Sequence, residues 1–177
     1  QLRPDLPAGH IAMGHYYYWG KLDYDNALKE LDIAARRQPN SLDVIFGMAA
    51  IERRRGHWKD AIANFQKAYQ LDPRSSDIVF NLAETYNLVR EYDQAIRFYD
   101  KGISIEPDGA YPRMEKLLAM LLAGASEDSV GQQLREGGVG GLAAHDVEGG
   151  DGQPLDDHLH AEQLELPEIG GEDLVEL

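Results

Sequence analysis

The sequence predicts an all-α protein in which helical hairpins stack along the chain as a solenoid. The first observation is a repeat: Pro39, Pro73 and Pro107 lie 34 residues apart, a period typical of repeat architectures. Three further sets of residues keep the same step, namely Ala27, Ala61 and Ala95, then Leu31, Phe65 and Tyr99, then Ala34, Ala68 and Gly102. The second observation is that apolar residues within one cycle recur every three or four positions in two groups. This spacing indicates two amphipathic helices per cycle.

The first cycle is longer than the others by one residue. We expect residues 1–6 to be the end of a preceding repeat, because Pro4 lies 35 residues before Pro39. Residues 7–40 then form the first repeat with a one-residue insertion, which we place in the segment "WGKL". A chain that opens on the end of a repeat is expected to be a piece of a longer array or of a larger protein.

The next two cycles fit the period without an insertion. Residues 41–74 are the second repeat, in which Gly56 separates two helices because glycine adopts the left-handed conformation at little cost. Pro73 closes this repeat, since proline cannot continue a helix. Residues 75–108 are the third repeat, and Arg90 stands there at the place of Gly56.

The pattern fades after Pro107. Residues 109–136 read as a capping helix region, which would cover the last apolar face of a stack. Residues 137–177 form an acidic, Gly-rich tail with no Phe, Trp or Tyr and no Lys or Arg. Such a composition buries too little apolar surface to offset its ordering entropy, so we expect the tail to be mostly disordered. Its leucines lie among acidic residues, a pattern typical of short binding motifs. A tail that is only solvated is the alternative.

The cycles resemble the tetratricopeptide repeat (TPR). That family has a period of 34, small residues at the eighth, twentieth and twenty-seventh places, and proline at the thirty-second. The second repeat fills these places with Ala49, Ala61, Ala68 and Pro73. The resemblance implies a right-handed α-solenoid of TPR hairpins, a concave groove lined by the first helix of each repeat, and no cofactor.

The same resemblance assigns places two, five, nine, twelve and thirteen of each repeat to the groove. The candidate peptide-binding residues on this basis are His15, Tyr18, Trp19, Phe46, Arg53, Arg54, Phe80, Glu84 and Asn87. Within the run "YYYW" we expect Tyr17 to face Leu31 in the core, while Tyr18 and Trp19 turn to the groove. The alternative is that all four aromatic side chains serve packing alone.

Phe46 and Phe80 are expected to form an apolar floor flanked by Arg53 and Arg54. This arrangement would suit a peptide that carries hydrophobic and acidic side chains. A solvated charged face is the alternative role for the two arginines. Some members of the family clamp a terminal carboxylate with lysine and asparagine, but the corresponding places here hold Ile11, His15 and Gly47.

Composition and motifs give little support to other functions. The net charge of −14 makes nucleic acid an improbable partner, and no apolar run is long enough for a membrane span. The chain has no cysteine, which fits a cytoplasmic protein. The tail segment "DDHLH" does not fix ligands in a defined geometry, so we expect no metal site. We find no catalytic constellation and predict that the chain is not an enzyme.

The sequence therefore predicts a non-catalytic module that binds a protein or peptide partner in its groove, as a regulatory part of a larger signalling protein. The chain's own acidic tail is one candidate occupant of that groove. The alternative function is a self-associating structural scaffold, in which repeat ends stack between molecules or the tail of one chain enters the groove of another, so that a homo-oligomer forms.

Overall fold

The computed structural model describes residues 6–136, and this range contains eight α-helices, one π-helix and no strand. The α-helices are α1 (Pro7–His15), α2 (Tyr24–Arg37), α3 (Leu42–Arg54), α4 (Trp58–Leu71), α5 (Ser76–Leu88), α6 (Tyr92–Ile105), α7 (Ala110–Leu122) and α8 (Glu127–Glu136), with the π-helix η1 (Tyr16–Lys21) between α1 and α2. The all-α prediction is confirmed for this part of the chain. The expectations about residues 1–5 and about the tail at 137–177 lie outside the described residues.

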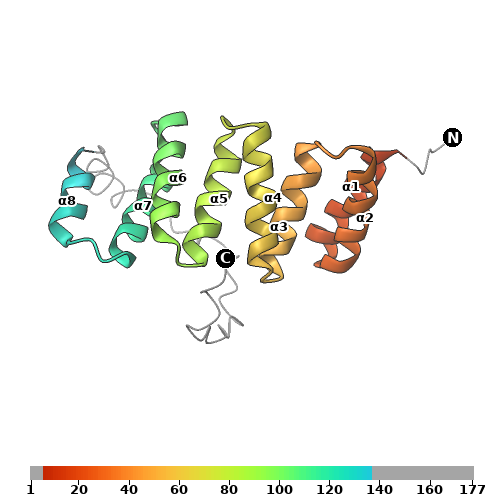
Figure 1. Ribbon diagram of the computed structural model, residues 1–177, viewed down its shortest axis with the longest axis horizontal. Coiled ribbons are helices and arrows are strands. Elements are labelled where there is room, and N and C mark those ends of the chain that lie inside the picture. The colour runs from red at the N-terminus through yellow and green to blue at the C-terminus, as the bar shows by residue number, and fades with distance from the viewer. Residues whose placement is uncertain (1–5, 137–177) are drawn as a thin grey trace, which may run out of the picture. The chain divides into compact units, whose positions relative to one another are not determined.

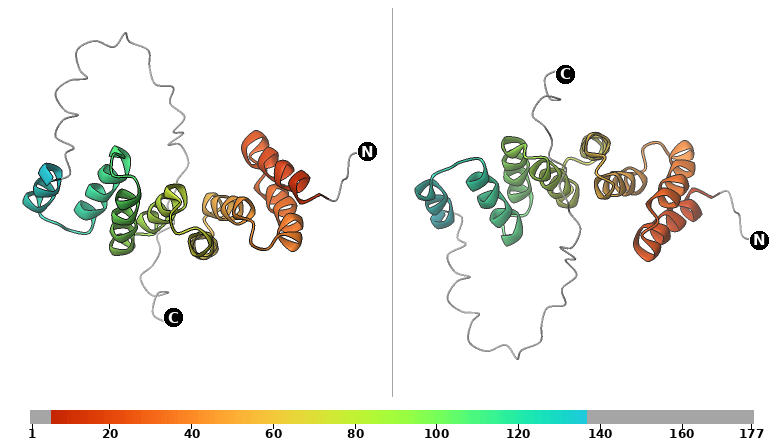
Figure 2. Two further views of the ribbon diagram at one scale, coloured as in Figure 1. Left: turned by 90° about the horizontal axis from the view of Figure 1, so that it is seen from above. Right: turned by 90° about the horizontal axis from the view of Figure 1, so that it is seen from below.

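The helices follow one another as packed neighbours in chain order (Figure 1). Within a hairpin, α3 packs on α4 and α5 packs on α6. Between hairpins, α2 packs on α3, α4 on α5, and α6 on α7. The first helices also meet, because α1 contacts α3 and α5 contacts α7. The two views in Figure 2 show the same succession of helix pairs from α1 to α8. This connectivity is that of a helical solenoid.

The residues that define the period make the core. Ala27, Ala61 and Ala95 are fully buried, and the bulky residues four positions later, Leu31, Phe65 and Tyr99, are buried beside them. A small side chain lets two helices approach closely, and the bulky one fills the space between them. The sequence pattern therefore identified the packing positions correctly.

Two glycines fix the junction of the first three helices around Leu31. A Cβ atom built on Gly14 would lie 2.8 Å from the Leu31 side chain, and one built on Gly47 would lie 3.1 Å from it. Leu31 itself is 1% exposed. The Leu31 side chain of α2 therefore packs directly on the backbones of α1 and α3, so that a Cβ at Gly14 would force Leu31 to shift and a Cβ at Gly47 would crowd it.

The aromatic run "YYYW" forms most of the π-helix η1, and Leu22, the residue that follows this helix, has a left-handed φ of 53°. A π-helix bonds residue i to i+5, so it holds more residues per turn than an α-helix and shifts the direction of the side chains that follow. This element overlaps the "WGKL" segment, in which the one-residue insertion is expected from the sequence.

The π-helix also corrects the expected directions of the aromatic side chains. Tyr18, assigned to the groove from the sequence, is 6% exposed and packs on Tyr24, with 5.9 Å between ring centroids. Tyr17, assigned to the core, is only partly buried. Trp19 is 69% exposed. The repeat register used for the prediction assumes α-helical rotation through this segment, and the π-helix breaks that assumption.

Two equivalent turns show how the hairpins close. Gly56 lies two residues after the end of α3 with a φ of 76°, and Arg90 lies two residues after the end of α5 with a φ of 64°. Both residues therefore adopt the left-handed conformation, which costs a residue with a Cβ about 1–2 kcal/mol. Arg90 keeps the turn of the glycine it replaces, at a cost to stability.

Candidate peptide-binding groove

The aromatic residues expected to form the groove floor lie on the first helices and are half-buried. The Phe46 ring of α3 packs edge-on against the Phe65 ring, with 5.4 Å between centroids. The Phe80 ring of α5 lies 6.0 Å from the Tyr99 ring and 5.1 Å from the Tyr111 ring. Phe80 thus joins α5 to α6 and α7, while each Phe keeps part of its surface open.

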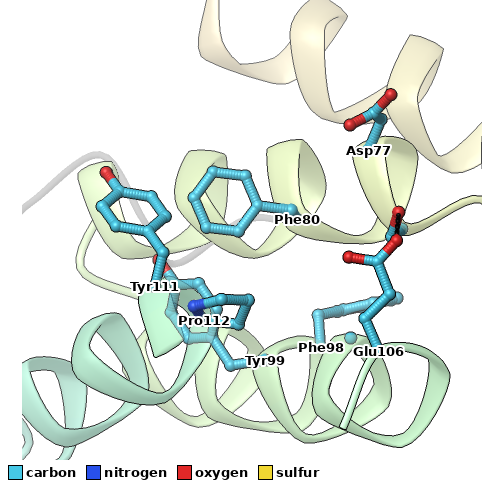
Figure 3. Close-up of a pocket in the computed structure, with 9 residues that line it drawn as sticks. Asp77, Phe80, Phe98, Tyr99, Glu106, Tyr111 and Pro112 are labelled. Carbon is cyan, nitrogen blue, oxygen red and sulfur yellow. Dashed lines mark hydrogen bonds between the residues drawn. The ribbon is translucent and has the colours of Figure 1, made fainter. Parts of the chain in front are cut away.

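A pocket of about 190 Å³ opens between α5, α6 and the start of α7. Phe80 and Tyr111 line one end, and Asp77 and Glu106 line the other (Figure 3). The volume is comparable with the ~150 Å³ cavity that holds a benzene ring in another protein. The pocket therefore has the size to receive one side chain of a partner.

Arg53 is not a free cation. Its guanidinium pairs with the Glu84 carboxylate at 2.5 Å, donates a hydrogen bond to Asn81 Oδ1 at 2.9 Å, and lies 5.5 Å from the centroid of the Phe65 ring. These contacts tie α3 to α5 across the first-helix face. From the sequence, Arg53 was expected either to bind a partner or to lie on a solvated charged face. Its pairing with Glu84, another candidate groove residue, was not expected. Arg54 is exposed and takes no part in this ion pair.

A second carboxylate approaches this ion pair from α7. Burial and the neighbouring Glu84 carboxylate raise the pKa of Glu115 above its usual range. Burial, Glu115 and Glu84 likewise raise the pKa of the Tyr111 hydroxyl. In both cases burial is the largest cause of the raised pKa, and the neighbouring carboxylates add to it.

Two buried polar atoms of the described residues have no hydrogen-bond partner: the Tyr99 hydroxyl and Asn87 Oδ1. Tyr99 is 1% exposed, and burial together with Glu115 and Glu84 raises the pKa of its hydroxyl. Figure 3 shows the Tyr99 ring extending from α6 towards Tyr111. An unpaired buried polar atom costs about 1–3 kcal/mol and calls for an explanation.

One face of α7 carries an apolar stripe that is not among the candidate residues expected from the sequence. Its five members are between 45% and 59% exposed, namely Tyr111, Met114, Leu118, Leu121 and Leu122. They stand at places two, five, nine, twelve and thirteen counted from Ala110, which are the places that the family resemblance assigns to the groove. The signal is present in the sequence, but Leu117 stands where the repeat has its small residue, which favours a capping helix over a further groove helix.

Other predicted and potential sites contribute less to this face. His15 of α1 is half-buried, and its ring lies near the Gly47 position. Glu52, His57 and Asp60 form a cluster with potential metal-ligand geometry within the described residues. His57 already contacts Glu52 Oε2 at 2.7 Å, and the Arg55 guanidinium lies 3.9 Å from the same oxygen. None of the helices described between residues 6 and 136 has the length and apolar character needed to cross a membrane.

Comparison with known proteins agrees with the repeat assignment. The family model described as tetratricopeptide repeat matches residues 52–121, so the resemblance stated from the sequence is confirmed. No curated protein sequence matches the chain.

Solved structures share the fold at low sequence identity. "Crystal structure of MamA protein" is 19% identical with a TM-score of 0.72, and the match covers 85% of this chain and 81% of that chain. "First TPR of Spaghetti (RPAP3) bound to HSP90 peptide SRMEEVD" is 13% identical with a TM-score of 0.63, covering 70% of this chain and 98% of that one. These identities show a common fold and nothing finer.

Proposed function

We propose that this chain, whose residues 52–121 are tetratricopeptide repeats, is a non-catalytic module that binds a segment of a partner protein on the face formed by its first helices. The observation that carries the proposal is the exposed apolar stripe of α7, which continues the half-buried Phe46 and Phe80 along that face. Contiguous exposed apolar surface rimmed by polar groups is typical of interaction sites. A solved relative of the same fold has a peptide bound, according to its title, which supports this use of the fold.

The test uses exposed positions, because Phe46 and Arg53 also support packing and their loss would confuse misfolding with lost binding. Leu118→Ser and Leu121→Ser remove apolar surface from the stripe. Ile33→Ser on α2 is the matched control, since Ile33 is also an exposed apolar residue, at 40%. In affinity capture, we expect a partner to be lost with both stripe variants and kept with the control. Equal capture by all variants would contradict the proposal.

Self-association is the second candidate function, and the same stripe favours it, because a second copy of the chain could bury these side chains. Light scattering across a concentration series separates the two functions. A mass that rises with concentration and returns to the monomer value in Leu118→Ser would support the scaffold. A concentration-independent monomer would support the binding module. As a module of this kind, the chain would serve as a regulatory part of a larger signalling protein.

A further inference from the structure

The charges on the first-helix face are unequal where α5 meets α7. The Glu84 carboxylate lies close enough to Glu115 to help raise its pKa. Among the described residues, Arg53 is the one cation that pairs with either carboxylate. The guanidinium already lies 2.5 Å from Glu84 and is also held by Asn81. One carboxylate therefore stays without a matching cation.

The unpaired Tyr99 hydroxyl is an independent observation at the same place. It is buried, has no partner, and belongs to the ring that lines the pocket beneath Tyr111. A hydroxyl oxygen accepts a hydrogen bond from an ammonium or guanidinium group. Tyr111 is 59% exposed, so a change of its side-chain rotamer on binding can uncover this hydroxyl, as commonly happens at interfaces.

The surroundings of the Glu115 carboxylate are apolar and aromatic. Tyr111, Glu115, Leu118 and Leu122 follow one another at steps of three and four, so they share one side of α7. A cation that reaches Glu115 would therefore have apolar neighbours along the helix and the Phe80 and Tyr111 rings beside it. Aromatic rings attract cations through their faces.

Resting on the proposed function, we propose that the subsite between α5 and α7 binds a lysine or arginine side chain of the partner, from a segment that also carries apolar residues at helical spacing. Glu115 and Glu84 accept the cation, Tyr99 contributes its hydroxyl oxygen, and the α7 stripe covers the apolar neighbours. This reverses the charge preference expected from Arg53 and Arg54. It also disfavours the chain's own tail as the occupant, because residues 137–177 contain no lysine or arginine.

The test is selection from a random 16-residue peptide library against the full chain, followed by calorimetric titration of the selected peptides. We expect enrichment of Lys or Arg next to Leu, Met or aromatic residues. Glu115→Gln should weaken the selected peptide about tenfold or more, since it removes the charge of one of the two carboxylates that accept the cation at a partly buried position. Asp32→Asn, an exposed carboxylate on α2, is the control and should leave affinity unchanged.

Tyr99→Phe supplies a readout that a purely structural tyrosine would not give. Removing an unpaired buried hydroxyl should raise the melting temperature of the free chain, while the selected basic peptide should bind several-fold more weakly. An unchanged peptide affinity in Tyr99→Phe would show that Tyr99 serves only packing, and would overturn its assigned role in binding the cation.

The failures of the two proposals can be told apart. Selected peptides that lack basic residues, and that are weakened by Leu118→Ser but not by Glu115→Gln, would overturn the cation subsite and leave the binding module standing. A library that yields no peptide dependent on Leu118 would count against both. A chain that dimerises without peptide and becomes monomeric in Leu118→Ser would show that a second copy is the occupant, which also overturns the cation subsite.

Discussion

The packing of Leu31 on Gly14 gives a prediction with a built-in control on the same helix. A Cβ at residue 14 would lie 2.8 Å from Leu31 Cδ2 and Cγ, whereas a Cβ at Gly9 meets nothing within 4 Å. Replacing glycine by alanine inside a helix stabilises it by about 0.5–1 kcal/mol. Gly9→Ala should show that gain. Gly14→Ala should show the same gain minus an overpacking cost of about 1–3 kcal/mol, and so be neutral to destabilising.

Urea unfolding by linear extrapolation measures both variants, and the difference between them isolates the overpacking cost. A third variant sharpens the test. Leu31→Ala alone should cost about 2.7–5 kcal/mol, because it opens a cavity at a fully buried position. In that background Gly14→Ala no longer meets Leu31 and should stabilise the chain as Gly9→Ala does. If Gly14→Ala already behaves like Gly9→Ala in the unaltered chain, or if its effect simply adds to that of Leu31→Ala, the close approach of α1 and α2 is refuted.

Three further predictions concern the turns, the π-helix and Glu115. Arg90→Gly should leave stability unchanged or raise it by up to about 1 kcal/mol in urea unfolding, because it relieves a left-handed conformation but adds freedom to the unfolded chain; a clear loss would contradict this. Tyr18→Ala should cost about 3–5 kcal/mol, as for a buried aromatic residue, while Trp19→Ala should change stability by less than about 1 kcal/mol; similar losses would place both side chains in one environment. The pKa of Glu115 is raised from 4.5 in the folded chain, so the folded state holds that proton more tightly and protonation favours folding. Glu115→Gln should therefore be more stable than the unaltered chain near pH 7, with the difference shrinking as the pH falls towards 4.5, and a constant difference across this range would exclude the raised pKa.

The core was readable from the sequence because its signal is repeated. Ala61, Phe65 and Ala68 recur one period later as Ala95, Tyr99 and Gly102, and a helix pair that stacks on a like pair must bury the same places each time. The π-helix was not readable in the same way. A one-residue surplus can be taken up in a turn or inside a helix, and only the second choice changes which face Tyr18 occupies.

The site was less predictable than the core, because it depends on contacts between different first helices. Arg53 and Glu84 were both assigned to the groove, but their pairing requires knowing how far apart α3 and α5 lie. Glu115 lies between two groove places of α7 and was missed because Leu117 does not fit the small-residue pattern. Once that one packing place fails, the groove places on the same helix are easily overlooked, although they keep their period.

Three features that lower the stability of the free chain coincide between α5 and α7. The α7 stripe exposes large apolar side chains, the Tyr99 hydroxyl is buried without a partner, and Glu115 lies near the like charge of Glu84. By contrast, the small residues of the repeat, Ala27, Ala61 and Ala95, are fully buried. Departures from good packing, hydrogen bonding and charge balance are expected at functional sites, where a partner supplies what the free chain lacks. A single basic, amphipathic segment would correct all three departures at once, whereas an acidic segment would correct only the exposure of the stripe and would add a third negative charge.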